Sequence, residues 1–172
     1  MAEEKKVLTI TEEVRELVYD IQNKAFLTGR THEATKETGY ESASNMQASN
    51  DAEDSYEIKR SIADAFATLK GLLGEWLVEE KSTTNNRIDR AIDDGGQLTL
   101  VLNLPSNYNS AAGESVGNNV HAYLVASALA RWFAITNKGE AEGYAARATS
   151  HLEMAKRALY QRRRPERPVY GG

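Results

Sequence analysis

The sequence of 172 residues contains no cysteine. Without a thiol, the chain forms no disulfide bond, and it offers neither a thiolate ligand for zinc nor a cysteine nucleophile. The absence excludes these three kinds of chemistry together, although by itself it does not assign the chain to a redox compartment.

Apolar runs long enough to span a membrane are also absent. The most apolar stretch extends from Val120 to Ile135, and it is interrupted by His121, Ser127 and Arg131. Because a helix needs about 20 apolar residues to cross a bilayer, this stretch predicts a buried core helix. The first residues are charged and no apolar segment follows them, so we expect no signal peptide and no membrane partner.

Histidine is scarce, which limits the sites for metals and for proton transfer. The three histidines, His32, His121 and His151, do not lie at the short spacings typical of zinc ligands. His121 and His151 fall on two segments that we expect to pack as antiparallel helices, where the two rings could approach each other. The pattern favours histidines with ordinary hydrogen-bond partners or in solvent, and we expect no metal site.

Two stretches match functional motifs only in part. Asp89, Asp93 and Asp94 only loosely resemble a calcium loop, because Ala91 occupies the third position of the loop and no glutamate closes it at the twelfth. Residues 113 to 117 contain the letters of a nucleophile elbow around Ser115, but the chain lacks the alternating strands and helices that the elbow requires. We expect no catalytic residue, no bound cofactor and no enzymatic activity.

The sequence does contain strong helical periodicity, which predicts a single, mainly α domain built as a bundle of about four helices. Apolar residues recur every three to four positions over residues 12 to 27 and again over residues 51 to 81. Gly71 and Gly74 interrupt the second of these helices, and we expect them to permit the close approach of another backbone. Residues 31 to 50 show no periodicity and are predicted to form a long flexible loop.

The C-terminal third predicts a helical hairpin over residues 111 to 164. Its first helix is apolar almost all the way round and must be surrounded by other elements, whereas its second helix has a single apolar face. Between the two, residues 137 to 139 read Asn-Lys-Gly, which is typical of a helix end. We therefore expect the two helices to pack antiparallel.

A small β element is predicted before this hairpin. Residues 97 to 104 are β-like, and they follow Asp-Gly and Gly-Gly dipeptides that favour tight turns. We expect a β-hairpin over residues 87 to 104, in which residues 87 to 93 pair with residues 97 to 104. The alternative is a strand that pairs with another subunit. Residues 7 to 10 are predicted to form a short extended entry to the first helix.

Positive charge is concentrated at the C-terminal end. Between Lys156 and Pro168 six basic residues stand against one acid, so this segment carries +5 and the rest of the chain −9 of the net −4. The helix dipole accounts for one or two of these cations, and Pro165 prevents the helix from continuing. Residues 165 to 172 are therefore predicted to be an extended basic tail. The predicted partner-binding residues are Arg157, Arg162, Arg163, Arg164 and Arg167.

Two kinds of partner suit this cluster: an acidic protein surface, such as a neighbouring subunit, and the phosphates of DNA. The acidic remainder of the chain favours the protein partner.

Several local sequences resemble those of small helical neck proteins of tailed bacteriophages and prophages. They are Leu104-Pro105 followed by an Asn-Tyr-Asn turn, Ala-Tyr-Leu-Val from Ala122, Ala-Arg-Trp-Phe from Ala130, Asn137-Lys138, Glu-Ala-Glu-x-Tyr from Glu140, and Ala-Leu-Tyr-x-Arg before the arginine-rich end. The similarity covers roughly residues 98 to 168, and it rests on helix-packing and tail features.

The resemblance to head-to-tail connector, or adaptor, proteins implies a structural role. Such a chain would form a ring with copies of itself, would bind the portal and the tail or neck proteins, and would reside in the virion neck after assembly in the cytoplasm of the bacterial host. The alternative is a DNA-binding packaging or regulatory protein that uses the arginine cluster, with DNA contact that is weak and non-specific.

Overall fold

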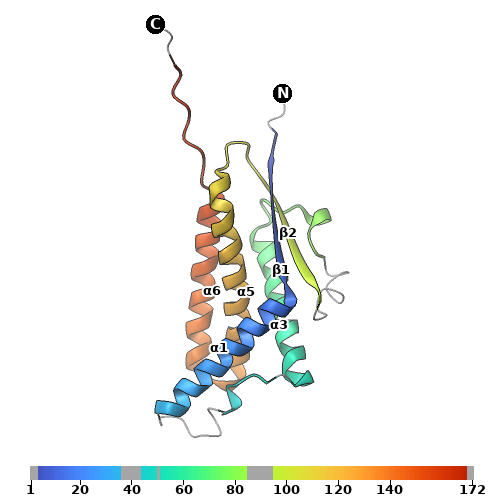
Figure 1. The fold of residues 1–172 in the computed structure, drawn as a ribbon, viewed down its shortest axis with the longest axis vertical. Coiled ribbons are helices and arrows are strands. Elements are labelled where there is room, and N and C mark those ends of the chain that lie inside the picture. The colour runs from blue at the N-terminus through green and yellow to red at the C-terminus, as the bar shows by residue number, and fades with distance from the viewer. Residues whose placement is uncertain (1–3, 36–43, 50, 85–94, 170–172) are drawn as a thin grey trace.

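The computed structural model describes residues 4–35, 44–49, 51–84 and 95–169. Within these residues the chain is mainly helical, with four long helices and a small two-stranded antiparallel sheet (Figure 1), which confirms the predicted fold class. In chain order the elements are β1 (Lys6–Glu13), α1 (Val14–Thr35), α3 (Ala52–Leu72), the short 3-10 helix η1 (Glu79–Lys81), β2 (Gln97–Leu104), the 3-10 helix η2 (Ser110–Ala112), α5 (Gly113–Thr136) and α6 (Lys138–Leu159).

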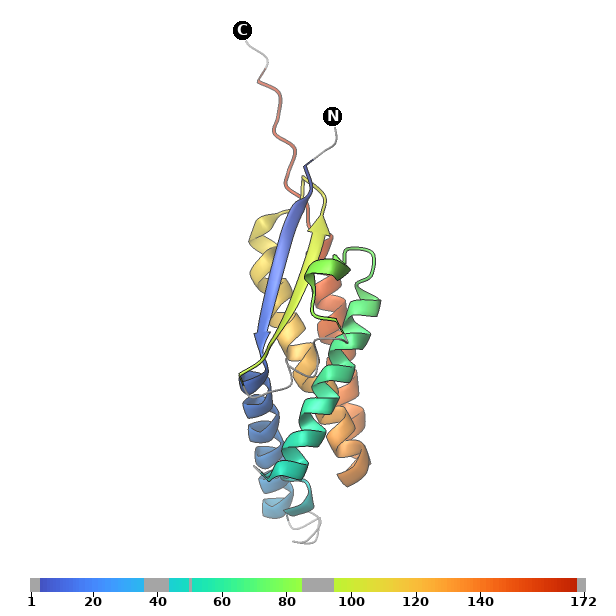
Figure 2. The ribbon, with the colours of Figure 1, turned by 90° about the vertical axis from the view of Figure 1, so that its right-hand side faces the viewer.

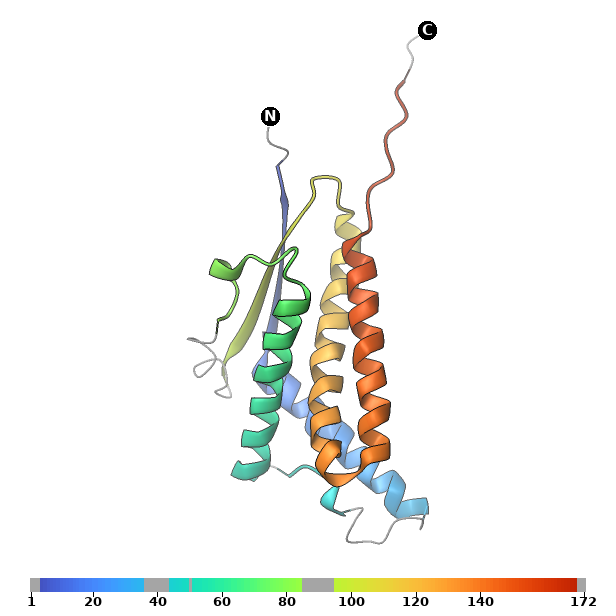
Figure 3. The same ribbon diagram turned by 180° about the vertical axis from the view of Figure 1, so that it is seen from behind.

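Helices α5 and α6 form the predicted antiparallel hairpin and run along the length of the molecule (Figures 1 and 3). Asn137 joins them: its backbone N–H donates to the Phe133 carbonyl at 2.7 Å, and its side-chain oxygen accepts from the Glu140 N–H at 3.2 Å. The same residue therefore ends one helix and caps the next. None of the described helices has the length and apolar character of a membrane span.

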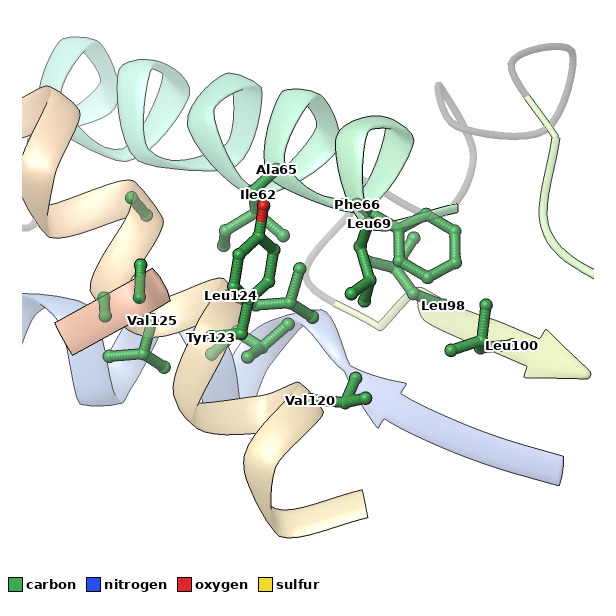
Figure 4. Packing of buried hydrophobic residues seen from close by; sticks show 14 of the residues in the cluster. Ile62, Ala65, Phe66, Leu69, Leu98, Leu100, Val120, Tyr123, Leu124 and Val125 are labelled. Atoms are coloured by element: carbon green, nitrogen blue, oxygen red, sulfur yellow. The ribbon is translucent and has the colours of Figure 1, made fainter. Parts of the chain in front are cut away.

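Helix α5 is surrounded by other elements, as its apolar sequence predicts. Figure 4 shows side chains of α3, β2 and α5 meeting in one apolar layer, in which Leu69 of α3, Leu98 of β2 and Leu124 of α5 are all fully buried. On its other side, Phe133 stacks on Tyr144 of α6 with ring centroids 5.4 Å apart. The buried residues of α5 are Val116, Val120, Tyr123, Leu124, Val125, Ala126, Ala128, Leu129 and Phe133.

Helix α6 carries a glycine that the packing does not require. Gly143 is exposed, and apart from its own helix backbone no atom of the described residues lies within 4 Å of the position that a Cβ would occupy. Since a glycine inside a helix costs about 0.5–1 kcal/mol relative to alanine, we expect Gly143→Ala to raise the free energy of unfolding by about that amount. Denaturant titration measures the change. Gly113→Ala is the matched control, because its Cβ would lie 3.3 Å from Leu8 Cδ1; a loss of stability in Gly143→Ala would contradict this packing.

Helix α1 is longer than predicted, because it continues past residue 27 to Thr35. The additional turns contact α6: the Thr28 and Tyr144 hydroxyls lie 3.2 Å apart, and His32 Nε2 lies 2.8 Å from Glu140 Oε1. These contacts join residues more than 100 positions apart, so local periodicity could not show where the helix ends.

The segment predicted as a loop over residues 31 to 50 is accordingly shorter at its start, and residues 36 to 43 and 50 lie outside the described residues. Its second half is tied to the core. Met46 is 1% exposed, and its carbonyl accepts a hydrogen bond from the Trp132 indole N–H at 2.9 Å. A single large apolar side chain therefore anchors this segment against α5.

Helix α3 is shorter than predicted, ending at Leu72 rather than near Lys81. The chain then turns, and residues 76 to 83 run beside β2 (Figure 2). The predicted close approach of another backbone at Gly71 and Gly74 is wrong. Apart from its own helix backbone, no described atom lies within 4 Å of a Cβ at Gly71, and the nearest described atom to one at Gly74 is the Gly71 carbonyl oxygen at 3.2 Å. Both glycines mark the end of the helix.

The predicted antiparallel strand pair before α5 is present, with a different partner. Strand β2 pairs with β1, in a register that runs from Lys6 opposite Leu104 to Glu13 opposite Gln97. Residues 87 to 93, the predicted local partner, lie outside the described residues. The turn-forming dipeptides before β2 favoured a local hairpin, but β2 already has partners on both edges: β1 on one and residues 76 to 83 on the other.

Candidate functional site

The end of α6 is capped by an arginine from the predicted partner-binding cluster. Arg162 Nη1 donates to the Leu159 carbonyl at 2.8 Å, and the guanidinium carbon lies 5.9 Å from the centroid of the Tyr160 ring. A cation at this position satisfies a terminal carbonyl and interacts favourably with the helix dipole. Arg162 is therefore largely occupied within the chain.

The loop between β2 and η2 fixes the point at which the chain leaves the helices. The Asn109 N–H donates to the Gln161 carbonyl at 3.0 Å, and the Arg163 N–H donates to the Asn107 carbonyl at 2.8 Å. These two backbone hydrogen bonds hold the residues on either side of Arg162 in an extended conformation beside the loop. The direction of the following residues is thus set by the body of the molecule.

Residues 163 to 169, here called the arginine tail, extend beyond the helices at the same end as the start of β1 (Figures 1–3). Every one of them is exposed. Among the described residues, no carboxylate forms an ion pair with Arg163, Arg164 or Arg167. Two prolines restrict the backbone of the arginine tail. Three guanidinium groups are thus presented outward on a stiffened segment.

Arg157 is separate from the arginine tail. It lies in the last turn of α6, its side chain is exposed, and within the described part of the chain it forms no ion pair. The five predicted residues therefore divide into three groups: Arg157 on the helix, Arg162 at its cap, and the other three on the arginine tail.

Beside Arg162 lies a hollow of about 500 Å³ that the sequence alone does not reveal. The Trp76 and Tyr160 rings meet edge to face at its side, with centroids 5.2 Å apart. The Tyr160 hydroxyl donates to Glu75 Oε2 at 3.2 Å, and this hydrogen bond is the main cause that raises the pKa of Tyr160. The residues that line the hollow are Lys5, Glu75, Trp76, Asn103, Leu104, Pro105, Ser106 and Arg162.

His121 forms the most perturbed ionisable site among the described residues. Its Nδ1 lies 2.7 Å from Glu12 Oε2, and its Nε2 lies 2.8 Å from Asp20 Oδ2. The imidazole thereby joins α5 to the end of β1 and to α1. The hydrogen bond to Glu12 is the largest cause of a raised pKa of His121, which is about 9. The hydrogen bond to Asp20 also raises the pKa, whereas burial of the ring lowers it. At neutral pH the ring is an imidazolium held by two carboxylates.

The expectation that His121 has ordinary hydrogen-bond partners is confirmed, but the sequence did not identify the two carboxylates. Glu12 lies near the end of β1 and Asp20 lies in α1, so no single periodic pattern relates their two side chains. Nothing in the local sequence shows that both carboxylates meet α5. The contact spans 109 residues to Glu12 and 101 to Asp20, so it depends on the tertiary fold.

The other two histidines also have polar partners. His151 Nδ1 lies 3.0 Å from Asn119 Oδ1, and His32 contacts Glu140 in the extension of α1. His121 and His151 thus point to separate partners. Across the described ranges, no group of three or more histidines and carboxylates could hold a metal ion. The aspartates of the partial calcium motif at residues 89 to 94 lie outside those ranges.

Ser115 lies in the first turn of α5 and not on a turn between a strand and a helix. Its hydroxyl lies 3.4 Å from Asn119 Nδ2, which also donates to the Ser115 carbonyl at 2.8 Å. In the described part of the chain no histidine or carboxylate contacts this hydroxyl directly. The geometry is that of a polar helix start.

Comparisons with protein-family models, with curated proteins and with solved structures found no match for this chain.

Proposed function

We propose that this chain is a structural virion protein of a tailed bacteriophage or prophage, a ring-forming head-to-tail connector that joins the portal to the tail. Its work is association and it performs no catalytic turnover. It resides in the virion neck after assembly in the bacterial cytoplasm. The observation that carries the proposal is the arginine tail, whose three outward guanidinium groups lack carboxylate partners among the described residues.

An acidic protein partner suits this arrangement. Guanidinium groups form bidentate, charge-assisted hydrogen bonds with carboxylates. The start of the arginine tail is fixed by the backbone bond from Arg163 to Asn107, so less conformational entropy is lost when the tail is captured. The body of the chain is itself acidic, and it therefore offers a complementary surface to the tail of another copy.

Contact between the tail of one copy and the body of the next joins two different patches. Such heterologous contacts generate closed rings when the rotation between copies closes. In such a ring the arginine tails of all copies lie on the same side, where the portal or a neighbouring subunit would bind them. Ring formation and portal binding thus both depend on the basic arginine tail and its attraction to acidic surfaces.

The alternative function is DNA binding by the same arginines, as in a packaging or regulatory protein. The outward guanidinium groups suit phosphates as well as carboxylates. The net charge of −4 for the whole chain opposes general attraction to DNA. A duplex titration over a range of salt concentrations separates the two functions, because phosphate neutralisation gives a steep dependence of the logarithm of affinity on the logarithm of salt.

Light scattering after size-exclusion chromatography tests the proposed assembly. We expect the purified chain to form a larger species of defined stoichiometry when mixed with the portal protein of its own genome, and we expect a chain lacking residues 163 to 172 to form no such species with the portal. A full-length chain that stays monomeric with the portal over a wide range of concentrations would contradict the proposal. Tight, steeply salt-dependent duplex binding would favour the alternative.

A further inference from the structure

Among the described residues, strand β1 has a neighbouring strand on one edge only, which is β2. The edge of β2 that faces away from β1 is hydrogen-bonded to residues 76 to 83. The Thr83 N–H donates to the Thr99 carbonyl at 2.9 Å, the Val78 N–H donates to the Val101 carbonyl at 2.8 Å, and the Asn103 N–H donates to the Trp76 carbonyl at 2.7 Å. Residues 99, 101 and 103 of β2 therefore direct their backbone groups away from β1.

This orientation fixes the backbone of β1 as well. In an antiparallel ladder, two directly opposed residues either exchange hydrogen bonds or both point their backbone groups away from each other. Thr11, Thr9 and Val7 stand opposite residues 99, 101 and 103. Their N–H and C=O groups consequently face the free edge of β1, and no described residue binds them. Figure 2 shows β2 on one side of β1 and no described strand on the other.

The free edge lacks the features that usually protect edge strands. Natural edges are protected by prolines, bulges or charged residues in the middle of the strand. The register of β1 with β2 is continuous over eight residues, and residues 7 to 11 contain neither proline nor charge. Val7 is 57% exposed on the outer face of the strand. The backbone of β1 is therefore available to a further strand.

The residues on that face are complementary to their own reverse order. They are Lys5, which directly precedes β1, and Val7, Thr9, Thr11 and Glu13 of the strand. Lys5 and Thr9 are exposed, and the Glu13 side chain is 44% exposed. A second β1 that runs antiparallel with Thr9 opposite Thr9 would place Lys5 against Glu13 at both ends. The residues whose N–H and C=O groups face the free edge, Val7, Thr9 and Thr11, would then stand opposite one another in the two copies. Opposite charges on directly opposed residues stabilise such pairs.

We propose that the free edge of β1 is a homodimer interface, in which two copies pair β1 antiparallel about Thr9 and form a four-stranded sheet across a two-fold axis. The occupant of the edge is thus a second copy of this chain. Because a two-fold contact is isologous and closes after two copies, the dimer is distinct from the ring proposed above and does not depend on it. Strand addition of this kind derives its affinity from main-chain hydrogen bonds.

Sedimentation velocity of the full-length chain, from micromolar to millimolar concentration, tests the interface together with two sets of variants. In Thr9→Pro the lost N–H faces the free edge, and proline suits an extended backbone, so β1 and β2 stay paired. We expect Thr9→Pro to weaken dimerisation at least about tenfold with unchanged circular dichroism and unfolding temperature. Lys5→Glu is expected to weaken the dimer, and Lys5→Glu combined with Glu13→Lys is expected to restore it.

A single-cysteine variant gives an independent measurement, since the chain has no cysteine of its own. Under mild oxidation Thr9→Cys is expected to form a disulfide-linked dimer, because opposed residues in paired strands lie within disulfide range. Thr149→Cys, on the exposed face of α6, is the control that should not cross-link. A chain that remains monomeric at every concentration, or a dimer that Thr9→Pro leaves unchanged and Thr9→Cys fails to cross-link, would overturn the proposal.

Discussion

Raising the pH from 6.5 to above 9 is expected to lower the free energy of unfolding by about 3 kcal/mol through the deprotonation of His121. The pKa of His121 is raised from 6.5 to about 9 in the folded chain, and each pH unit of difference corresponds to about 1.4 kcal/mol. Because the folded state binds the proton more tightly than the unfolded state, this stability is fully present below pH 6.5 and is lost as the pH rises through about 9.

Urea titrations at intervals across this pH range measure the free energy of unfolding. Subtracting the values for His121→Gln separates the contribution of His121 from that of other titrating groups. We expect the variant to be less stable than the wild type at pH 6.5 and to lack this part of the pH dependence. The imidazole resonances in an NMR titration give the pKa directly. A wild-type stability that stays level between these pH values, or an unchanged slope in His121→Gln, would contradict the double carboxylate contact.

The second large effect concerns the arginine tail. Replacing Arg163, Arg164 and Arg167 together with serine is expected to weaken binding to an acidic protein partner by about 100-fold. Each exposed ion pair contributes up to about 1 kcal/mol, and about 1.4 kcal/mol corresponds to a factor of ten in affinity. Surface plasmon resonance against the immobilised portal measures the change.

Two controls accompany that variant. Arg157→Ser removes one positive charge from the exposed side of α6, and we expect it to change the affinity little. The unfolding temperature of the triple variant should equal that of the wild type, because within the described residues these side chains form no ion pair. Equal affinities of the triple variant and the wild type would show that the partner binds elsewhere.

Much of the fold was predictable because it depends on local periodicity. The apolar circumference of α5, the single apolar face of α6 and the Asn137 cap between them are all properties of short windows of sequence. The same windows identified the strand at residues 97 to 104. Element type and the antiparallel packing of neighbouring helices follow from such patterns.

The errors arose where the outcome depends on contacts between distant residues. Strand β2 pairs with β1 across more than 80 intervening residues, whereas a turn-rich sequence favoured the nearer partner. Helix α1 extends past residue 27, and its last turns contact α6 through Tyr144 and Glu140. Gly71 and Gly74 suggested the close approach of another backbone, but they mark the end of α3.

The candidate site shows the same division. Clustering and exposure of the arginines follow from composition and from Pro165, so the sequence predicted the arginine tail. The retention of Arg162 at the helix cap depends on carbonyl geometry, and the attachment of Arg163 depends on a loop more than 50 residues earlier. The link from His121 to Glu12 and Asp20 required the full fold.

The most direct measurement is an electron cryomicroscopy map of the chain assembled on its portal. We expect a closed ring in which Arg163, Arg164 and Arg167 of each copy contact carboxylates of the portal or of the neighbouring subunit. A map in which this chain binds the portal while its arginine tail lies free in solvent or folds onto its own helices would contradict the claim that recognition through this tail is the function.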